Sequence, residues 1–237
     1  MENNIYSRTE SLIGKDSLNI LKNSKVIVFG IGGVGSFTVE SLCRCGIGEI
    51  SLVDFDTIDI TNINRQIHAM SNNIGKYKVD EMKKRIELIN PDIKVNTFKK
   101  KLDKNNVENF NLKYYDYVVD AIDIITSKIY LIKCCYENNI NVISAMGAGN
   151  KLDPTRFKVV DIYKTSGCPL ARVMRRELKK LGIKKLKCVC SDETSSGEVI
   201  ESYDRRKSSP SSISFIPSTM GLIITSEVVK DLILWNK

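Results

Sequence analysis

The segment KVIVFGIGGVGS, residues 25–36, carries the strongest structural signal in this chain of 237 residues. Its opening run, KVIVF, is apolar and β-branched enough for a central parallel strand that is buried on both faces. Gly30, Gly32 and Gly35 then form a G-x-G-x-x-G loop before a helix expected at 36–45. Such a loop lacks Cβ atoms and can approach a phosphate closely, and the helix N-terminus offers it free N–H groups. The segment therefore predicts a nucleotide site, although the loop alone does not distinguish NAD from ATP.

On either side of this segment, strand and helix patterns alternate. Strands are expected at 49–53, 93–98, 115–121 and 140–144, and helices within 7–22 and at 76–90 and 124–137. This alternation is typical of an α/β fold with a doubly wound, mostly parallel, Rossmann-like sheet. A C-terminal α/β extension follows, with strands at 157–163 and 185–190, a basic helix at 169–181, a polar loop at 191–212 and a last helix capped by Ser218. We expect a single domain over 1–237, with a nucleotide-binding core at 7–150 and the extension at 151–237.

The net charge of +8 is confined to one segment. Residues 164–187 hold nine of the 36 Lys and Arg and one of the 28 Asp and Glu, so the other 27 basic and 27 acidic residues cancel. A cationic helix stripe with a single acid repels itself unless an anion covers it, which favours contact with a nucleic-acid backbone over a solvated face. The candidate contacts are Arg172, Arg175, Arg176, Lys179, Lys180, Lys184 and Lys185, with Arg205, Arg206 and Lys207 as a weaker second cluster.

The composition, 42% hydrophobic and 27% charged, excludes a disordered chain. Seven cysteines without C-x-x-C spacing, and the lack of a signal-peptide core or an apolar span, predict a cytoplasmic protein with reduced thiols and no membrane segment. Cys188 and Cys190 lie two apart on an expected strand, so they should be buried on one face. His68 is the only histidine, which argues against a Ser-His-Asp triad, and we expect it to make a structural hydrogen bond.

A second motif, DFDTIDITNINRQ at 54–66, separates the nucleotide chemistries. Asp54 ends the second strand, where a carboxylate can accept hydrogen bonds from ribose hydroxyls. Arg65 and Lys78 add two cations, and Asp123 follows an expected strand at the edge where open sheets bind ligands. Hydride transfer needs none of these groups. A carboxylate that attacks an α-phosphate needs cations to neutralise the oxygens and an acid to hold Mg²⁺.

GIGGVGS, DxDxxxxxNxNRQ, the lysine on the next helix and D-A-x-D together resemble the ubiquitin-activating-type adenylyltransferases, the ThiF/MoeB/HesA-like superfamily, over residues 7–150. The match narrows within that superfamily. SRTESLIG, NINRQIHAM, SAMGAGNKLDPTRF and DIYKTSGCPLARVMRRELKKLGIKK are similar to the tRNA threonylcarbamoyladenosine dehydratases, and this likeness runs over essentially the whole chain.

The resemblance implies a reaction and a site. ATP would adenylate the carboxylate of threonylcarbamoyladenosine in tRNA, the side chain would cyclise to a hydantoin-type ring with loss of water, and AMP and pyrophosphate would leave. The implied ATP-binding residues are Gly30, Gly32, Gly33, Gly35, Asp54, Asp56, Asn62, Arg65, Gln66 and Lys78. The implied catalytic residues are Asp123, Arg65, Lys78 and Arg8, with Asp123 as the Mg²⁺ ligand and Arg8 donated across a homodimer to the partner's ATP.

Three other functions stay open at this point. They are an adenylyltransferase for the C-terminus of a ubiquitin-like sulfur-carrier protein, an NAD-dependent oxidoreductase, and a non-catalytic nucleotide- or tRNA-binding module. The missing C-x-x-C pairs and the basic segment weigh against the first. Cys168 departs from the resemblance, since Asp often precedes the Pro-Leu-Ala-Arg element. The sequence leaves open whether a monovalent cation or a sulfur-relay protein takes part, and which group assists ring closure.

Overall fold

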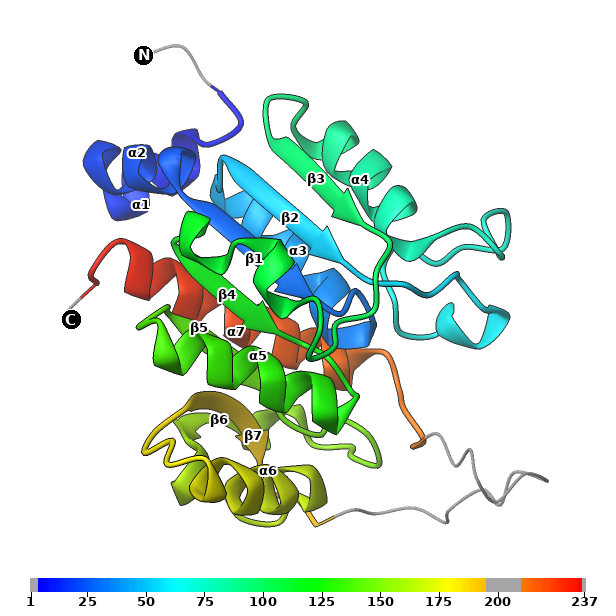
Figure 1. Cartoon of the computed structure of the whole chain (residues 1–237). Coiled ribbons are helices and arrows are strands. Elements are labelled where there is room, and N and C mark those ends of the chain that lie inside the picture. Colours follow the sequence, from blue (N-terminus) through cyan, green and yellow to red (C-terminus); the bar gives the residue numbers. More distant parts are fainter. Residues whose placement is uncertain (1–3, 195–209, 236–237) are drawn as a thin grey trace.

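The computed structural model describes residues 4–194 and 210–235. Within them, seven strands form one sheet in the order β3-β2-β1-β4-β5-β7-β6, parallel throughout except that β6 runs antiparallel to β7 (Figure 1). The strands are β1 Lys25–Phe29, β2 Glu49–Val53, β3 Lys94–Phe98, β4 Tyr117–Asp120, β5 Val142–Ala145, β6 Phe157–Asp161 and β7 Lys187–Ser191. The doubly wound, mostly parallel α/β fold is therefore confirmed. β6 and β7 of the predicted extension continue the same sheet beside β5.

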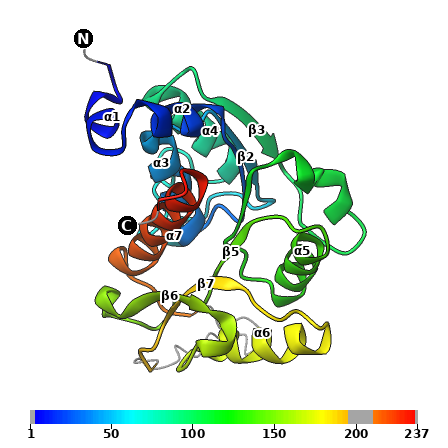
Figure 2. The same ribbon diagram turned by 90° about the vertical axis from the view of Figure 1, so that its left-hand side faces the viewer.

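Helices cover both faces of the sheet, as Figure 2 shows. They are α1 Ser7–Ile13, α2 Lys15–Asn23, α3 Gly33–Cys45, α4 Lys78–Ile89, α5 Ile125–Glu137, α6 Pro169–Lys180 and α7 Phe215–Leu232. α3, α4 and α7 bury their apolar stripes against one face, and α5 and α6 pack on the other. Since both faces are covered, β1 and β2 are almost entirely buried, which explains the apolar run of β1.

α7 closes the fold by returning from the end of the chain to pack along α3. The contact is close because a Cβ at Gly221 would lie only 2.5 Å from the Val34 carbonyl oxygen. Thr225 also donates a hydrogen bond from its hydroxyl to the Thr38 carbonyl. The C-terminal helix thus packs on the predicted nucleotide-binding core, although it is separated from it in sequence.

Several predicted boundaries were wrong for identifiable reasons. Residues 7–22 form two helices rather than one, because Gly14 between them has a φ of +85°. The helix expected from 36 begins at Gly33, so the glycine loop supplies its first turn. The last helix begins at Phe215, and Ser218 is no cap: its hydroxyl donates to the Ser214 carbonyl inside the helix. Of the expected polar loop, residues 195–209 lie outside the described part.

No helix in the described ranges, 4–194 and 210–235, is both long enough and apolar enough to cross a membrane.

Candidate functional site

The candidate site lies at the edge of the sheet where the parallel strands end. β1 and β4 are neighbours there, but the chain leaves β1 for α3 on one face and leaves β4 for α5 on the other. Such a reversal opens a crevice between the two loops, and open α/β sheets bind ligands at this point. The loops after β1, β2, β4 and β5 all reach this edge (Figure 1).

The glycine loop after β1 is built for close approach. A Cβ at Gly35 would overlap the Gly30 carbonyl oxygen, and one at Gly30, whose φ is +85°, would press on the Ala121 carbonyl. These two glycines therefore make the turn. Gly32 differs, because a Cβ there would meet nothing within 4 Å. It is the N-cap of α3, so open space lies beside the free N–H groups of a helix N-terminus.

At Gly33, which is also predicted to bind the nucleotide, the side where a Cβ would stand faces protein. A Cβ there would lie 3.0 Å from Pro217 at the start of α7 and 3.4 Å from the Arg65 carbonyl oxygen. Its small size lets these two segments close over the loop.

Asp54, directly after β2, holds the glycine loop in place. Its carboxylate accepts hydrogen bonds from the backbone N–H of Ile31 at 2.6 Å and of Asp56 at 2.9 Å. Burial raises the pKa of this carboxyl, while the nearby Lys78 opposes the shift. Each oxygen has a second lone pair, so Asp54 can keep the loop bonded and still accept from a ligand hydroxyl.

Lys78 is the first residue of α4 and is only 6% exposed. Its ammonium pairs with Asp56 at 2.7 Å, and its backbone N–H donates to the Asp56 carbonyl at 3.1 Å. Two bonds to one residue therefore fix this cation beside the Asp54 loop.

The NxNRQ element forms a short turn that starts as a 3-10 helix, Ile60–Asn62. Asn62 is buried and its side chain accepts from the Asp59 N–H at 3.2 Å, which closes a capping box. Arg65 donates to the Thr61 carbonyl at 2.8 Å and to the Asn64 side chain at 3.0 Å. Among the described residues no carboxylate pairs with Arg65, so its charge stays available to an anion.

Asp123 and Arg8 lie at opposite ends of the strands. Asp123 is exposed on the loop after β4, next to the backbone that Gly30 approaches, and its carboxylate has no ion-pair partner in the described ranges. Arg8 is exposed on α1, at the edge where the strands begin (Figure 1). One chain thus brings the glycine loop, Asp54, Lys78 and Asp123 together, but not Arg8.

Sequence reasoning missed the segment that covers this edge. The Ser211 carbonyl accepts from the Asn150 N–H at 2.8 Å, and the Ser211 N–H donates to the Asn150 side chain at the same distance. Asn64 donates to the Ser212 carbonyl at 3.1 Å. Residues 210–212 therefore join the loop after β5 to the NxNRQ turn. The only available signal was the expected polar loop at 191–212, which does not say where that loop lies.

The basic segment forms α6 and the turn after it. Ala171, Met174 and Leu178 bury one side of the helix. The Cys168 sulfur, just before α6, would lie 3.2 Å from a Cβ at Gly147, so α6 begins at the same edge as the candidate site. Since β7 starts at the opposite edge, the cationic residues run from the site edge across the length of the sheet.

These cations are not equivalent. Arg175 is half-buried and donates to the backbone carbonyl and the hydroxyl of Thr165, so its guanidinium is used inside the protein. Arg176 and Lys180 both pair with Glu177. The other four of the seven predicted contacts, Arg172, Lys179, Lys184 and Lys185, are exposed and have no carboxylate partner among the described residues. Arg205, Arg206 and Lys207 lie outside it.

Cys168 takes the capping role that an acid would have. Its sulfur accepts from the Ala171 N–H at 3.5 Å at the N-terminus of α6. The neighbouring Cys190 thiol and the surrounding backbone amides lower the pKa of the Cys168 thiol. Cys188 and Cys190 are buried on one face, as predicted, and burial raises the pKa of Cys188 to about 12.

The structure contradicts the structural hydrogen bond that we expect from the His68 side chain. It is 1% exposed, and neither ring nitrogen has a hydrogen-bond partner among the described residues. Burial lowers its pKa to about 4, and the cations Lys78 and Arg85 act in the same direction against Glu81. His68 is therefore a neutral buried side chain, and only its backbone carbonyl bonds, accepting from Asn73 at 2.8 Å.

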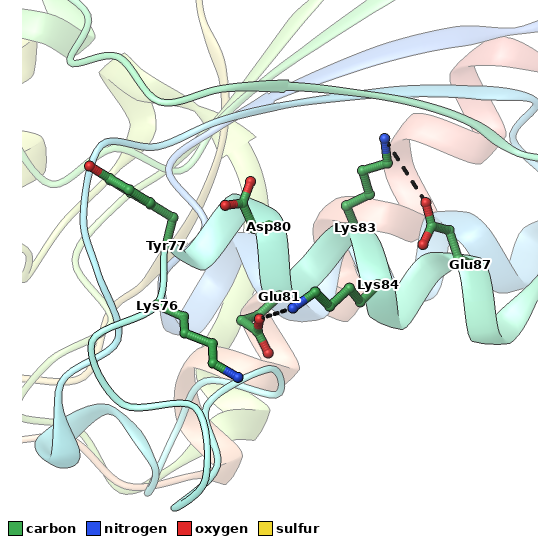
Figure 3. Close-up of a pocket in the computed structure, with 7 residues that line it drawn as sticks. All are labelled: Lys76, Tyr77, Asp80, Glu81, Lys83, Lys84 and Glu87. Atoms are coloured by element: carbon green, nitrogen blue, oxygen red, sulfur yellow. Dashed lines mark hydrogen bonds and ion pairs between the residues drawn. The ribbon is translucent and has the colours of Figure 1, made fainter.

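A surface hollow of about 480 Å³ lies along the outer side of α4 (Figure 3). Its charges largely satisfy one another, since Lys84 pairs with Glu81 at 2.6 Å and Lys83 approaches Glu87 at 3.9 Å. We assign it no function.

Comparison with known proteins gives one consistent result. The model of the ThiF family matches residues 6–236. The chain is 46% identical over 239 aligned positions to the tRNA threonylcarbamoyladenosine dehydratase of Bacillus subtilis, covering 96% of this chain and 94% of that protein. For two further relatives of that name the alignment spans 63% and 65% of their own length.

A solved structure extends the likeness to three dimensions. The Escherichia coli tRNA N6-threonylcarbamoyladenosine dehydratase in complex with AMP superposes with a TM-score of 0.88 at 34% identity, covering 96% of this chain and 93% of that one. The same protein has also been solved with ATP. The adenylyltransferase and sulfurtransferase UBA4 of Vanderwaltozyma polyspora is more distant, at 37% identity over 55% of this chain and 30% of that protein.

Proposed function

This chain belongs to the ThiF family and, within it, to the tRNA threonylcarbamoyladenosine dehydratases, and we propose that it dehydrates threonylcarbamoyladenosine in tRNA at the expense of ATP. The side-chain carboxylate attacks the α-phosphate, pyrophosphate leaves, and ring closure then releases AMP. The balance is one ATP split to AMP and pyrophosphate and one water lost from the nucleoside. The observation that carries the proposal is the meeting of the glycine loop, Lys78 and Asp123 at the reversal between β1 and β4.

ATP fits this edge through groups that the fold has already oriented. The free amides beside Gly32 would receive the phosphates, and Asp54 would accept from the ribose. Arg65 and Lys78 would neutralise the oxygens around the reacting phosphorus. Asn62 and Gln66 support the turn that carries Arg65, since both are buried within it.

Mg²⁺ suits Asp123. Its carboxylate is exposed, follows a strand at the ligand-binding edge and has no cation partner in the described ranges. Magnesium keeps several waters and binds through one or two carboxylates plus substrate phosphates, so a single acid is enough. A bound Mg²⁺ would supply charge to the departing pyrophosphate.

The arginine of α1 would complete the site of a second subunit. Arg8 stands at the edge opposite its own glycine loop, so it would serve catalysis by reaching a partner's ATP. This arrangement requires a homodimer with two composite sites.

tRNA would lie along α6. The unpaired cations Arg172, Lys179, Lys184 and Lys185 run away from the site edge, so phosphates held there would leave the modified base over the ATP. Such contacts position a nucleic acid without reading its sequence. We also infer a cytoplasmic location, since all seven cysteines are free thiols.

The second candidate is an adenylyltransferase for a ubiquitin-like sulfur-carrier protein. It would use the same ATP edge, but the cationic face of α6 would then have no anionic partner of matching length.

Mass spectrometry of tRNA nucleosides tests the proposal. After incubation with the protein, ATP and Mg²⁺, threonylcarbamoyladenosine should lose the mass of one water, with one AMP formed per ring. Asp123→Asn should slow this about 10²- to 10³-fold, the usual cost of removing a charge that stabilises the transition state. Adenylation of a sulfur-carrier protein with unchanged tRNA would favour the second candidate. Tight NAD binding without ATP binding would exclude both.

A further inference from the structure

A buried ion pair lies directly beneath the candidate site. Lys128 of α5 and Asp120 at the end of β4 are both fully buried, with the ammonium nitrogen 2.9 Å from a carboxylate oxygen. Neither residue faces solvent or belongs to the ATP-binding residues assigned above. A buried charge pair is costly to desolvate, and apolar residues of the same size would give the fold equal or greater stability. The pair therefore calls for a reason other than stability.

The ammonium of Lys128 uses all three of its donors. Besides Asp120 it bonds to the Ile122 carbonyl at 3.0 Å and to the Ala145 carbonyl at 2.9 Å. The Asp120 carboxylate is also fully engaged, accepting from the Ser144 hydroxyl at 2.6 Å and from the Ile122 N–H at 3.2 Å. The network is closed, so each member has a fixed position.

The two carbonyls belong to the loops that form the site. Ile122 immediately precedes Asp123, and Ala145 is the last residue of β5 before the loop that reaches Ser211. Ile122 lies beyond the end of β4, so strand pairing does not fix it, whereas Ala145 is held by its pairing with Val189 of β7. One cation thus ties the loop after β4 to the sheet-bound end of β5.

We propose that Lys128 is a positioning residue of the adenylation site, which holds the Asp123 loop against the glycine loop through the Ile122 and Ala145 carbonyls. The inference rests on the proposed role of Asp123 toward Mg²⁺ and ATP. A displacement of about 1 Å in such a group is enough to lower a rate 10²-fold.

The test is the double variant Asp120→Asn/Lys128→Met in the full-length protein. Lys128→Met alone would leave a buried carboxylate unpaired and unfold the chain. In the double variant the asparagine still accepts from Ser144 and the methionine fills the space of the lysine. We expect circular dichroism to show that the fold is retained and the rate of AMP formation to fall about 100-fold. The KM for ATP should change less than threefold, because Lys78 and the glycine loop are untouched. Lys133→Met, an exposed change on the same helix, is the matched control and should behave as wild type.

A second readout separates positioning from a general loss of structure. Calorimetric titration of nucleotide into the protein, under conditions in which the nucleotide is not hydrolysed, should show that the double variant needs several-fold more Mg²⁺ to reach full nucleotide binding. Nucleotide binding without Mg²⁺ should be unchanged. Ser144→Ala, which removes only the hydroxyl donated to Asp120, should move both quantities in the same direction by a few-fold. It also decides the question if the double variant does not fold.

Wild-type rate and Mg²⁺ dependence in the folded double variant, or in Ser144→Ala, would overturn the proposal. Failure of the proposed function looks different: Asp123→Asn would then retain full activity, or the wild type would form no AMP with modified tRNA.

Discussion

The carboxyl edge of the sheet and the outer face of α6 use charge in opposite ways. At the edge, two lysines are buried and paired, Lys78 with Asp56 and Lys128 with Asp120, while Arg65 and Asp123 carry the charges left open for a ligand. On α6, Arg172 and Lys179 are exposed, and no carboxylate among the described residues contacts either one.

The difference follows from what each region has to bind. Charge that develops at one phosphorus atom is stabilised best by groups that are fixed before the ligand arrives, because reorienting these groups during the reaction would cost part of the stabilisation of the transition state. Holding a polyanion needs cations whose counterions can be released, which requires solvent exposure and no internal partner. The two buried lysines at the edge are thus part of the folded structure, whereas the cations on α6 can exchange counterions for phosphates.

The experiment with the largest expected effect tests whether one chain supplies all the catalytic residues of the site at the edge. Arg8→Ala and Asp123→Asn homodimers should each be almost inactive. A random mixture of the two should recover about a quarter of wild-type activity, because half of the dimers are mixed and each of these has one intact site. The measurement is AMP formation with modified tRNA after subunit exchange.

Two controls make that mixture decisive. Each variant mixed with itself must stay inactive, and size-exclusion chromatography with light scattering must show dimers. Dimers that exchange subunits without recovering activity would mean that Arg8 does not act across an interface.

A smaller effect is expected on α6. Arg172→Glu/Lys179→Glu should weaken tRNA binding at least tenfold and lower the slope of log K against log salt concentration by about 0.7–0.9 for each phosphate that is no longer neutralised. ATP affinity should not change, because neither residue is among the proposed ATP-binding residues. Lys83→Glu/Lys84→Glu on α4 makes the same charge change elsewhere and should leave tRNA affinity within about twofold. An equal loss in both double variants would mean that net charge, not the face of α6, attracts the tRNA.

The fold was predictable because its signals are local. KVIVF followed by three spaced glycines specifies strand, turn and helix within 21 residues, and the apolar periods repeat on both sides. The composition of the candidate site was readable for the same reason, since parallel strands end at one edge and bring their following residues together.

What sequence reasoning missed depends on contacts between distant or differently exposed residues. Helical spacing put Arg175 on the cationic stripe, but a period of 3.6 does not reveal that Thr165 accepts its hydrogen bonds. Lys128 could not be told from any other helix residue, because nothing in its own sequence places the Ala145 carbonyl beneath it. His68 was assigned a hydrogen bond from its residue type, whereas its environment in the described ranges lacks a partner.

The smallest expected effect concerns His68, a buried titratable group near the edge that, unlike the two buried lysines, has no partner for its side chain in the described residues. Its pKa falls from 6.5 to about 4 in the folded chain, so between these pH values the unfolded state binds a proton that the native state does not. Its contribution to stability is therefore complete above pH 6.5 and is lost as the pH falls toward 4. At pH 5.5 the loss is about 1 kcal/mol, or about 2–4 °C in Tm for a chain of this size.

His68→Leu should remove that part of the pH dependence. Since neither ring nitrogen has a partner in the described residues, an apolar side chain of similar volume sacrifices no hydrogen bond, and the variant should be at least as stable at pH 7.5. The measurement is the fall in Tm from pH 7.5 to 5.5, which should be about 2–4 °C smaller in the variant, with the carboxylates common to both proteins cancelling. If the two falls were equal, His68 would titrate alike in both states. A buried acceptor would then have to stabilise the imidazolium against Lys78 and Arg85, and the edge would hold one more paired charge instead of an exception.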